Sequence, residues 1–186
     1  MWITHSYAGT IKGKYDYLIF LLYQDYIEQE KEMARKFKSS LERLARNLGD
    51  RGAVVVPFGG DAEEVREHVL NKDWTKEELG LLMRTPCLLL IDTDFNEFNP
   101  RAHKWAILNV DGGMGGASVN DLAEKIHKIS IAVSKGEVDL FDLFEEYSRE
   151  NIMNRFGEAV FLRPNFMGFG IDLTKLYELI FGRKKV

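Results

Sequence analysis

The stretch Leu82–Phe95, "LMRTPCLLLIDTDF", decides which fold we expect for this chain. In it, Pro86 directly precedes the apolar run Cys87–Ile91, and Asp-Thr-Asp follows that run. A short continuous apolar run is typical of a strand that is buried on both faces, and proline is tolerated at the first residue of a strand. The sequence therefore predicts a buried strand that is entered through a proline.

Two similar runs precede this strand and one follows it. Tyr15–Tyr23 and Ala53–Phe58 are continuous apolar runs, and Glu28–Leu48 between them has apolar residues at helical spacing. A strand–helix–strand unit of this kind is expected to be parallel, with a right-handed crossover. His103–Val110 is predicted to be the fourth strand. No helix separates it from the third strand, so we expect those two strands to be antiparallel.

Helix-start patterns follow the second strand. Asp61 with Glu64, and Thr75 with Glu78, each form a predicted capping box. In such a box the first side chain accepts a hydrogen bond from the backbone N–H of the later residue, whose side chain accepts one from the backbone N–H of the first. Trp74 stands between the two helices and is predicted to fill a corner of the core. These patterns predict two short helices between the second and third strands.

The last third of the chain is predicted to continue with helices. Ser118 with Asp121 is expected to cap one helix, and Asp139 to begin another. Residues 158–173 have a strand-like pattern and precede a last helix at Thr174–Phe181. No low-complexity or Pro/Ser-rich linker divides the chain. We therefore expect a single compact unit: a core with an N-terminal extension in residues 1–135, and an extension in residues 136–186 that packs on it.

The element order β-α-β-α-β-β-α, together with Thr85-Pro86-Cys87 before an apolar run, resembles the thioredoxin-like fold superfamily. Members of that superfamily enter the third strand through a cis-proline. The resemblance covers roughly residues 15–133. It implies a thioredoxin-like α/β core, a mixed four-stranded sheet flanked by helices on both faces, here with a C-terminal α/β extension.

The resemblance also indicates which chemistry is missing. Redox members carry Cys-x-x-Cys at the start of the first helix, whereas the matching stretch here, Tyr23–Lys31, holds Tyr26 and Gln29 near the cysteine positions. The chain has one cysteine, Cys87, which we expect to pack as a small apolar side chain. Disulfide exchange and single-thiol glutathione chemistry are therefore excluded, and the sequence favours a protein that is not an enzyme.

We therefore expect a non-redox binding or regulatory module that recognises a protein or a small-molecule ligand. The resemblance implies a groove around the proline, built by Gln24–Ile27 and Arg84–Pro86, which would accept an extended partner by strand addition. The glycine-rich turn at residues 110–118 is a second place where backbone N–H groups could hold an anion. The predicted ligand-binding residues are Gln24, Tyr26, Arg84, Thr85 and Pro86, with Gly115, Gly116 and Ser118 in the turn.

Two alternative functions stay open. Asp92 and Asp94, at i and i+2 after a strand, could hold Mg²⁺ and resemble the opening motif of haloacid dehalogenase-type phosphatases, which would make the chain a Mg²⁺-dependent phosphate-processing hydrolase. The motif lies mid-chain without a second acidic pair, which favours aspartates that begin a loop and bond their own backbone. The other alternative is a structural subunit of an oligomeric assembly, held by Phe166, Met167 and Phe169.

Charge and composition limit the partners. A net charge of −4 and a pI near 5.6 predict neither a nucleic-acid partner nor an anionic membrane partner. Scattered histidines and a single cysteine predict no zinc site, and no cofactor motif is present. Because no stretch has the order of a signal peptide or the length of a membrane span, we expect a cytoplasmic protein.

Overall fold

The computed structural model describes residues 2–4, 15–83, 86–109, 117–136 and 139–153. These residues form a mixed five-stranded sheet whose strands are β1 (Trp2–Thr4), β2 (Tyr17–Leu22), β3 (Gly52–Val56), β4 (Cys87–Ile91) and β5 (Trp105–Asn109). The strand order is β1-β3-β2-β4-β5. β3 is parallel to β1 and β2, whereas β4 is antiparallel to β2 and β5. The predicted parallel first pair and antiparallel last pair are thus confirmed.

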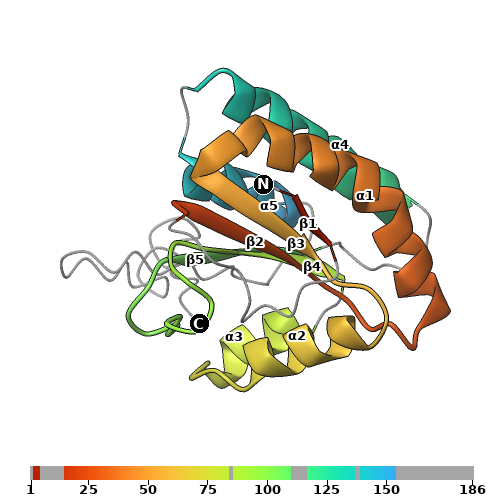
Figure 1. The fold of residues 1–186 in the computed structure, drawn as a ribbon, viewed down its shortest axis with the longest axis vertical. Coiled ribbons are helices and arrows are strands. Elements are labelled where there is room, and N and C mark those ends of the chain that lie inside the picture. The colour runs from red at the N-terminus through yellow and green to blue at the C-terminus, as the bar shows by residue number, and fades with distance from the viewer. Residues whose placement is uncertain (1, 5–14, 84–85, 110–116, 137–138, 154–186) are drawn as a thin grey trace, which may run out of the picture.

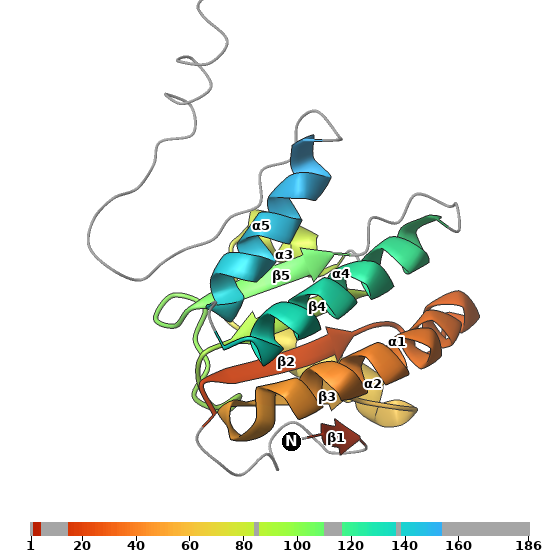
Figure 2. The same cartoon turned by 90° about the horizontal axis from the view of Figure 1, so that it is seen from above.

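Helices cover both faces of this sheet. The described helices are α1 (Glu28–Leu48), α2 (Gly60–Leu70), α3 (Lys76–Leu82), α4 (Ala117–Ser134) and α5 (Leu140–Met153), with a short 3-10 turn at Gly49–Arg51. α1, α4 and α5 lie over one face, and α2 and α3 lie on the other (Figures 1 and 2). The mixed α/β class with helices on both faces therefore agrees with the sequence.

The central strand β2 shows how the core divides into two layers. Successive side chains of a strand point to opposite faces. Ile19 and Leu21 pack in the cluster beneath α1 and α4, whereas Leu18, Phe20 and Leu22 pack in the cluster against α2 and α3. All five side chains are buried. The continuous apolar run of this strand is explained by burial on both faces.

Helix α1 has the bounds that its sequence predicts. Phe37, Leu41 and Leu44 recur at helical spacing, and all three side chains are buried against the sheet. At the end of the helix, Gly49 adopts a positive φ of 57°, and its N–H bonds the carbonyls of the last turn. A glycine tolerates this conformation without the steric cost that a Cβ atom would add.

Of the two capping boxes predicted after β3, the one at Thr75 is present and the prediction of the one at Asp61 is wrong. Thr75 accepts a hydrogen bond from the Glu78 N–H, and the Glu78 carboxylate accepts one from the Thr75 N–H, as predicted. α2 instead begins at Gly60, and its cap residue is Gly59, which offers no side chain. Asp61 therefore lies inside the first turn, where its carboxylate meets the positive end of the helix dipole.

The starts of the last two helices show the same contrast. α4 begins at Ala117, so Ser118 is a helical residue and not the cap that its sequence predicts. Before α5, the Asp139 carboxylate accepts a hydrogen bond from the Phe141 N–H at 2.8 Å, which confirms Asp139 as the start. Residues 158–173 and the predicted helix at Thr174–Phe181 lie outside the described residues.

The two ends of the chain add to the core. At the N-terminus, β1 pairs in parallel with β3, an addition that the sequence did not predict. Towards the C-terminus, Leu143 and Phe144 of α5 share a hydrophobic cluster with Ala106 and Leu108 of β5. The first turns of α5 thus pack on the sheet.

Candidate functional site

Three of the predicted binding residues, Gln24, Tyr26 and Pro86, lie at one end of the sheet. Leu22 at the end of β2 pairs with Cys87 at the start of β4, and β3 ends at the same edge because it is parallel to β2. Helices α1 and α2 begin directly beyond these two strand ends. We call residues 23–31, 57–66, 83, 86 and 87 the strand-exit end.

The loop from β2 into α1 is held by its own backbone and by one buried carboxylate. The cap residue of α1, Ile27, has no capping side chain. Glu30 in the first turn instead reaches back and accepts a hydrogen bond from the Gln24 N–H at 2.7 Å. The Tyr26 hydroxyl donates to the Gln24 side-chain oxygen, and Lys31 lies 3.9 Å from the Asp25 carboxylate. The two predicted binding residues of this loop, Gln24 and Tyr26, are therefore partners of each other.

Tyr23 ties the two parallel strand ends together. Its ring is buried, and its hydroxyl donates to the Pro57 carbonyl at 2.8 Å. Burial raises the pKa of Tyr23 well above its usual range, and the Asp25 carboxylate raises it further, against a smaller opposing effect of Arg35. The phenol therefore remains a protonated hydrogen-bond donor at any physiological pH.

Cys87 packs as the sequence predicted. The side chain is fully buried in the cluster beneath α2 and α3. Burial raises the pKa of its thiol to about 12, the negative charge of Glu30 adds to this rise, and Arg66 opposes it. Since the thiolate is the reactive form, a thiol in this environment is not a nucleophile at neutral pH.

Arg66 of α2 brings a buried positive charge to the same region. Its Nη1 donates to the Glu63 carboxylate at 2.9 Å, and the residue is 8% exposed. The Arg66 Nε and the second Glu63 oxygen are buried without a hydrogen-bond partner. This pair lies on the α2 side of the sheet, whereas Glu30 approaches from the start of α1.

Two large apolar side chains project into solvent at this end. Tyr26 is 73% exposed and Met83 is 57% exposed, and they are the two most exposed large hydrophobic side chains among the described residues. Tyr26 follows Leu22 by four positions and Met83 precedes Cys87 by four, so the antiparallel pairing of β2 with β4 brings both residues to this end of the sheet.

The other predicted binding residues are buried, helical or outside the described part of the chain. Pro86 itself is buried, so its side chain is not part of the exposed surface. Ser118 lies in the first turn of α4. Several predicted residues lie outside the described part of the chain, namely Arg84, Thr85, Gly115 and Gly116 of the ligand-binding set, and Phe166, Met167 and Phe169 of the partner-binding set.

The alternative catalytic pair lies at the opposite end of the sheet, after β4. The Asp94 carboxylate accepts a hydrogen bond from the Asn96 N–H at 2.9 Å, and its carbonyl accepts one from the Glu97 N–H. This is the loop-starting turn that the composition favours. One oxygen of Asp92 is buried without a hydrogen-bond partner. The two side chains are therefore not joined in a common network.

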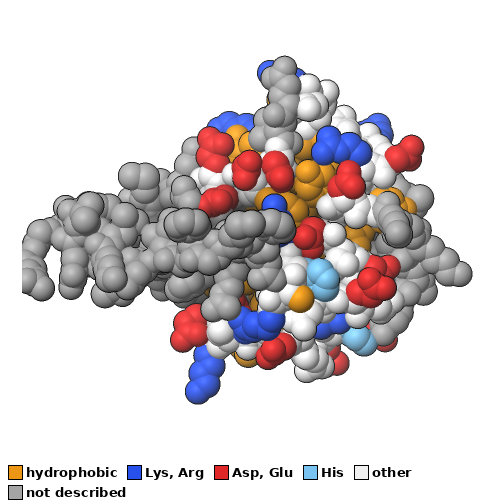
Figure 3. Space-filling model, turned by 90° about the vertical axis from the view of Figure 1, so that its left-hand side faces the viewer, with side chains coloured by type: hydrophobic (Ala, Val, Ile, Leu, Met, Phe, Trp, Pro, Cys, Tyr) orange, Lys and Arg blue, Asp and Glu red, His pale blue; other side chains and the backbone are white. Residues whose placement is uncertain are grey.

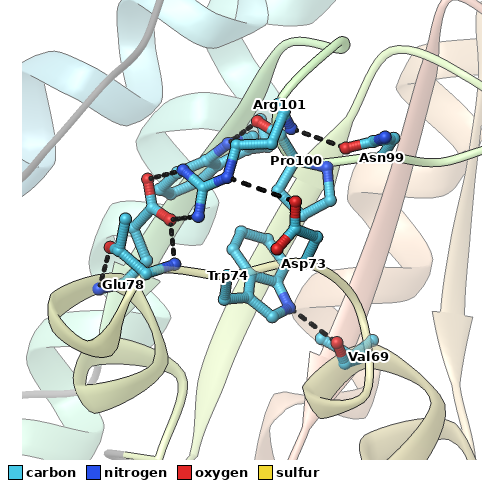
Figure 4. A network of polar contacts seen from close by, with 9 residues as sticks. Val69, Asp73, Trp74, Glu78, Asn99, Pro100 and Arg101 are labelled. Carbon is cyan, nitrogen blue, oxygen red and sulfur yellow. Dashed lines mark hydrogen bonds and ion pairs between the residues drawn. The ribbon is translucent and has the colours of Figure 1, made fainter.

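This opposite end also holds a polar network that the sequence did not reveal. Figure 3 shows the side of the molecule on which the β4–β5 loop lies, and acidic and basic side chains are interspersed there among the described residues. Figure 4 shows that Arg101 of this loop reaches both Asp73 and Glu78. Arg101 Nη2 lies 2.9 Å from Glu78, and Nε lies 3.8 Å from Asp73. In the sequence, the position of Glu78 predicts its role in the helix cap but not its ion pair with Arg101.

Trp74 and the long β4–β5 loop complete this corner. The Trp74 ring packs edge-on against Trp105 with 5.0 Å between centroids, and lies 5.6 Å from Phe98 of the loop. Its Nε1 donates to the Val69 carbonyl at 2.6 Å. Trp74 therefore fills the corner as predicted, and the long loop supplies part of the core.

Within the described ranges, no three side chains of His, Cys, Asp or Glu are placed to hold a metal ion. His103 accepts a hydrogen bond from the Asn99 N–H, and His127 lies 3.2 Å from Arg43. No described helix is both long enough and apolar enough to cross a bilayer.

Comparison with known proteins gave no match: no protein-family model, curated protein or solved structure is significantly similar to this chain.

Proposed function

We propose that this chain is a thioredoxin-like binding domain that recognises a segment of another protein at the strand-exit end, without disulfide chemistry. The observation that carries the proposal is the exposure of Tyr26 and Met83, each four positions in the sequence from one member of the Leu22–Cys87 pair. Large apolar side chains exposed together at one end of a domain are typical of interaction sites, because their burial by a partner releases water from apolar surface.

The order of strands supports the thioredoxin-like part of the proposal. Leaving out β1, the strands run β3-β2-β4-β5, with one parallel pair and two antiparallel pairs. α1 and α4 lie on one face, and the helices between β3 and β4 lie on the other (Figure 2). This is the arrangement that the β-α-β-α-β-β-α order of the sequence implies through its resemblance.

The absence of thiol chemistry rests on two positions. At the start of α1, where redox members place their cysteines, this chain has Tyr26 and Gln29. The single thiol, Cys87, is enclosed in the core with a raised pKa. A surface with an exposed aromatic ring and no accessible thiolate suits non-covalent recognition.

Site-specific photo-crosslinking tests the proposal. A photoreactive phenylalanine would replace Tyr26, Met83 or Ile131, and each protein would be irradiated in an extract of cells that express the chain. Ile131 on α4 is the matched control, because it is the next most exposed large hydrophobic side chain, at 41%. We expect one shared adduct from positions 26 and 83 and none of it from position 131.

Two results would contradict the proposal. Equal adducts from all three positions would show unspecific contact, and no adduct from positions 26 and 83 would show that this end is not a binding surface. An adduct whose mass is twice that of the chain would identify the partner as a second copy. Circular dichroism of each variant checks that the fold is unchanged.

A further inference from the structure

The negative charge of the protein is concentrated at the strand-exit end. Residues 23–31 contain three carboxylates and one cation, and residues 57–66 contain the same numbers. The two segments together thus carry a formal charge of −4, which equals the net charge of the whole chain. The rest of the chain is formally balanced, in keeping with the interspersed charges of the face in Figure 3.

The local cations and the helix dipoles do not cancel this charge. Lys31 is paired with Asp25, and Arg66 is paired with Glu63, so both cations are already counted in the sum. Each helix N-terminus contributes roughly half a positive charge, and α1, α2 and α4 all begin at this end, because β5, which precedes α4, ends opposite Cys87. About two and a half negative charges remain after this correction.

Three carboxylates of the strand-exit end have no partner among the described residues. Glu28 in the first turn of α1 is exposed and follows Tyr26 by two positions. Asp61 in the first turn of α2 is half-buried, and Glu64 is exposed. Within the described residues, none of these three carboxylates forms an ion pair or a side-chain hydrogen bond. Their charge is therefore free to act on a partner.

We propose that the partner segment is a basic peptide with an apolar anchor: its Lys or Arg side chains would face Glu28, Asp61 and Glu64, and its apolar side chain would pack between Tyr26 and Met83. This inference rests on the proposed function and specifies the partner. Complementary charge raises the association rate and suppresses acidic partners, while the apolar anchor supplies most of the contact energy. An acidic or nucleic-acid partner is repelled by the same carboxylates.

Selection from a random peptide library is the first test. A displayed library of peptides about 12 residues long would be selected on the full chain at about 0.05 M salt, where the Debye length exceeds 10 Å. We expect enriched peptides with a positive net charge and at least one aromatic or aliphatic residue. Their binding is then measured by fluorescence anisotropy with synthetic, end-blocked copies.

Charge-neutral variants provide the second measurement. Glu28→Gln with Asp61→Asn removes one carboxylate from each segment, and we expect the affinity for the enriched basic peptide to fall about fivefold, the effect of two exposed ion pairs. Asp50→Asn with Glu97→Gln is the matched control, because both side chains are exposed at the opposite end of the sheet. This control should bind as well as the unmodified chain.

The outcomes separate the two proposals. Neutral or acidic peptides that lose binding in Tyr26→Ala would overturn the basic-partner inference and leave the binding surface in place. An equal loss in the control pair would also overturn it, since the effect would then follow the net charge alone. If no peptide is enriched, or if every enriched peptide binds Tyr26→Ala and Met83→Ala unchanged, the proposed function fails as well.

Discussion

Arg101 and Glu78 form a two-pronged ion pair that fixes the β4–β5 loop to the first turn of α3. Arg101 Nη2 lies 2.9 Å from one Glu78 oxygen, and Nη1 donates to the other at 3.3 Å. The Glu78 side chain is 2% exposed, and it also accepts the Thr75 N–H at 2.7 Å. A single buried carboxylate thus caps a helix and anchors a loop that lies far from it in the sequence (Figure 4).

Replacement of Arg101 by alanine is expected to lower the free energy of unfolding by about 2–4 kcal/mol. The loss arises because the buried Glu78 carboxylate would keep its charge without a cation, and not only because one contact disappears. The measurement is the urea midpoint at neutral pH. Arg35→Ala removes the exposed pair with Glu32, at 3.9 Å, and should change the free energy of unfolding by less than about 0.5 kcal/mol. Equal effects of the two substitutions would contradict this role.

The stability of the protein is expected to decrease above pH 9 because of Cys87. Burial raises the pKa of the thiol from 9.0 to about 12, so the unfolded chain loses this proton at a lower pH than the folded chain does. The contribution of the Cys87 thiol to the free energy of unfolding is constant below pH 9 and is lost as the pH rises from 9 to 12. Between pH 8 and pH 9.5 the free energy of unfolding should fall by about 0.8 kcal/mol.

The comparison with Cys87→Ala isolates this thiol. The variant is less stable at every pH because it leaves a small cavity, but its stability should not show the thiol's decrease between pH 8 and pH 9.5. Tyr23, whose pKa is also raised by burial, begins to titrate in the unfolded chain only near 10.0, above this window. Parallel urea curves at the two pH values provide the measurement. The same decrease in both proteins would assign it to other groups.

Removal of the Tyr23 hydroxyl is expected to loosen the strand-exit end. Tyr23→Phe leaves the Pro57 carbonyl without its donor in a buried position, which typically costs about 1–2 kcal/mol. Tyr26→Phe is the matched control, because its hydroxyl bonds a surface side chain and its ring is 73% exposed. The control should change the free energy of unfolding by less than about 0.5 kcal/mol. The measurement is the thermal unfolding midpoint of each variant. Equal decreases of the midpoint in the two variants would contradict the prediction.

Regular apolar patterns predicted most of this fold. The bounds of α1 follow from Phe37, Leu41 and Leu44 at helical spacing, with Gly49 as the stop. The strands were predicted to be buried on both faces because their runs had no polar alternation, and burial confirms this for β2, β3 and β4. Such patterns are readable because each depends on neighbouring residues and on one environment.

Features that depend on distant partners were not readable in the same way. The Arg101–Glu78 pair joins residues 23 positions apart, and the sequence around either residue does not indicate its partner. Asp61 fits a capping box by spacing, but the sharp turn at Gly59, with φ of 63°, places the helix start differently. Tyr26 and Met83 come to the same end of the sheet only through the antiparallel pairing of β2 with β4. Each of these three features depends on how distant parts of the chain pack together, and the spacing of neighbouring residues does not predict that packing.

Asp92 and Asp94 supply the last prediction, which separates a structural turn from catalysis. Asp94→Ala should lower the free energy of unfolding by about 0.5–1 kcal/mol, because the Asn96 N–H loses its acceptor. Asp92→Asn should raise it by up to about 1 kcal/mol, because it removes a charge with one buried, unpartnered oxygen. Urea unfolding measures both changes. With Mg²⁺ and a panel of phosphate esters, we expect no turnover by the unmodified chain. Turnover that depends on Mg²⁺ and is lost in both variants would show that the two carboxylates are catalytic.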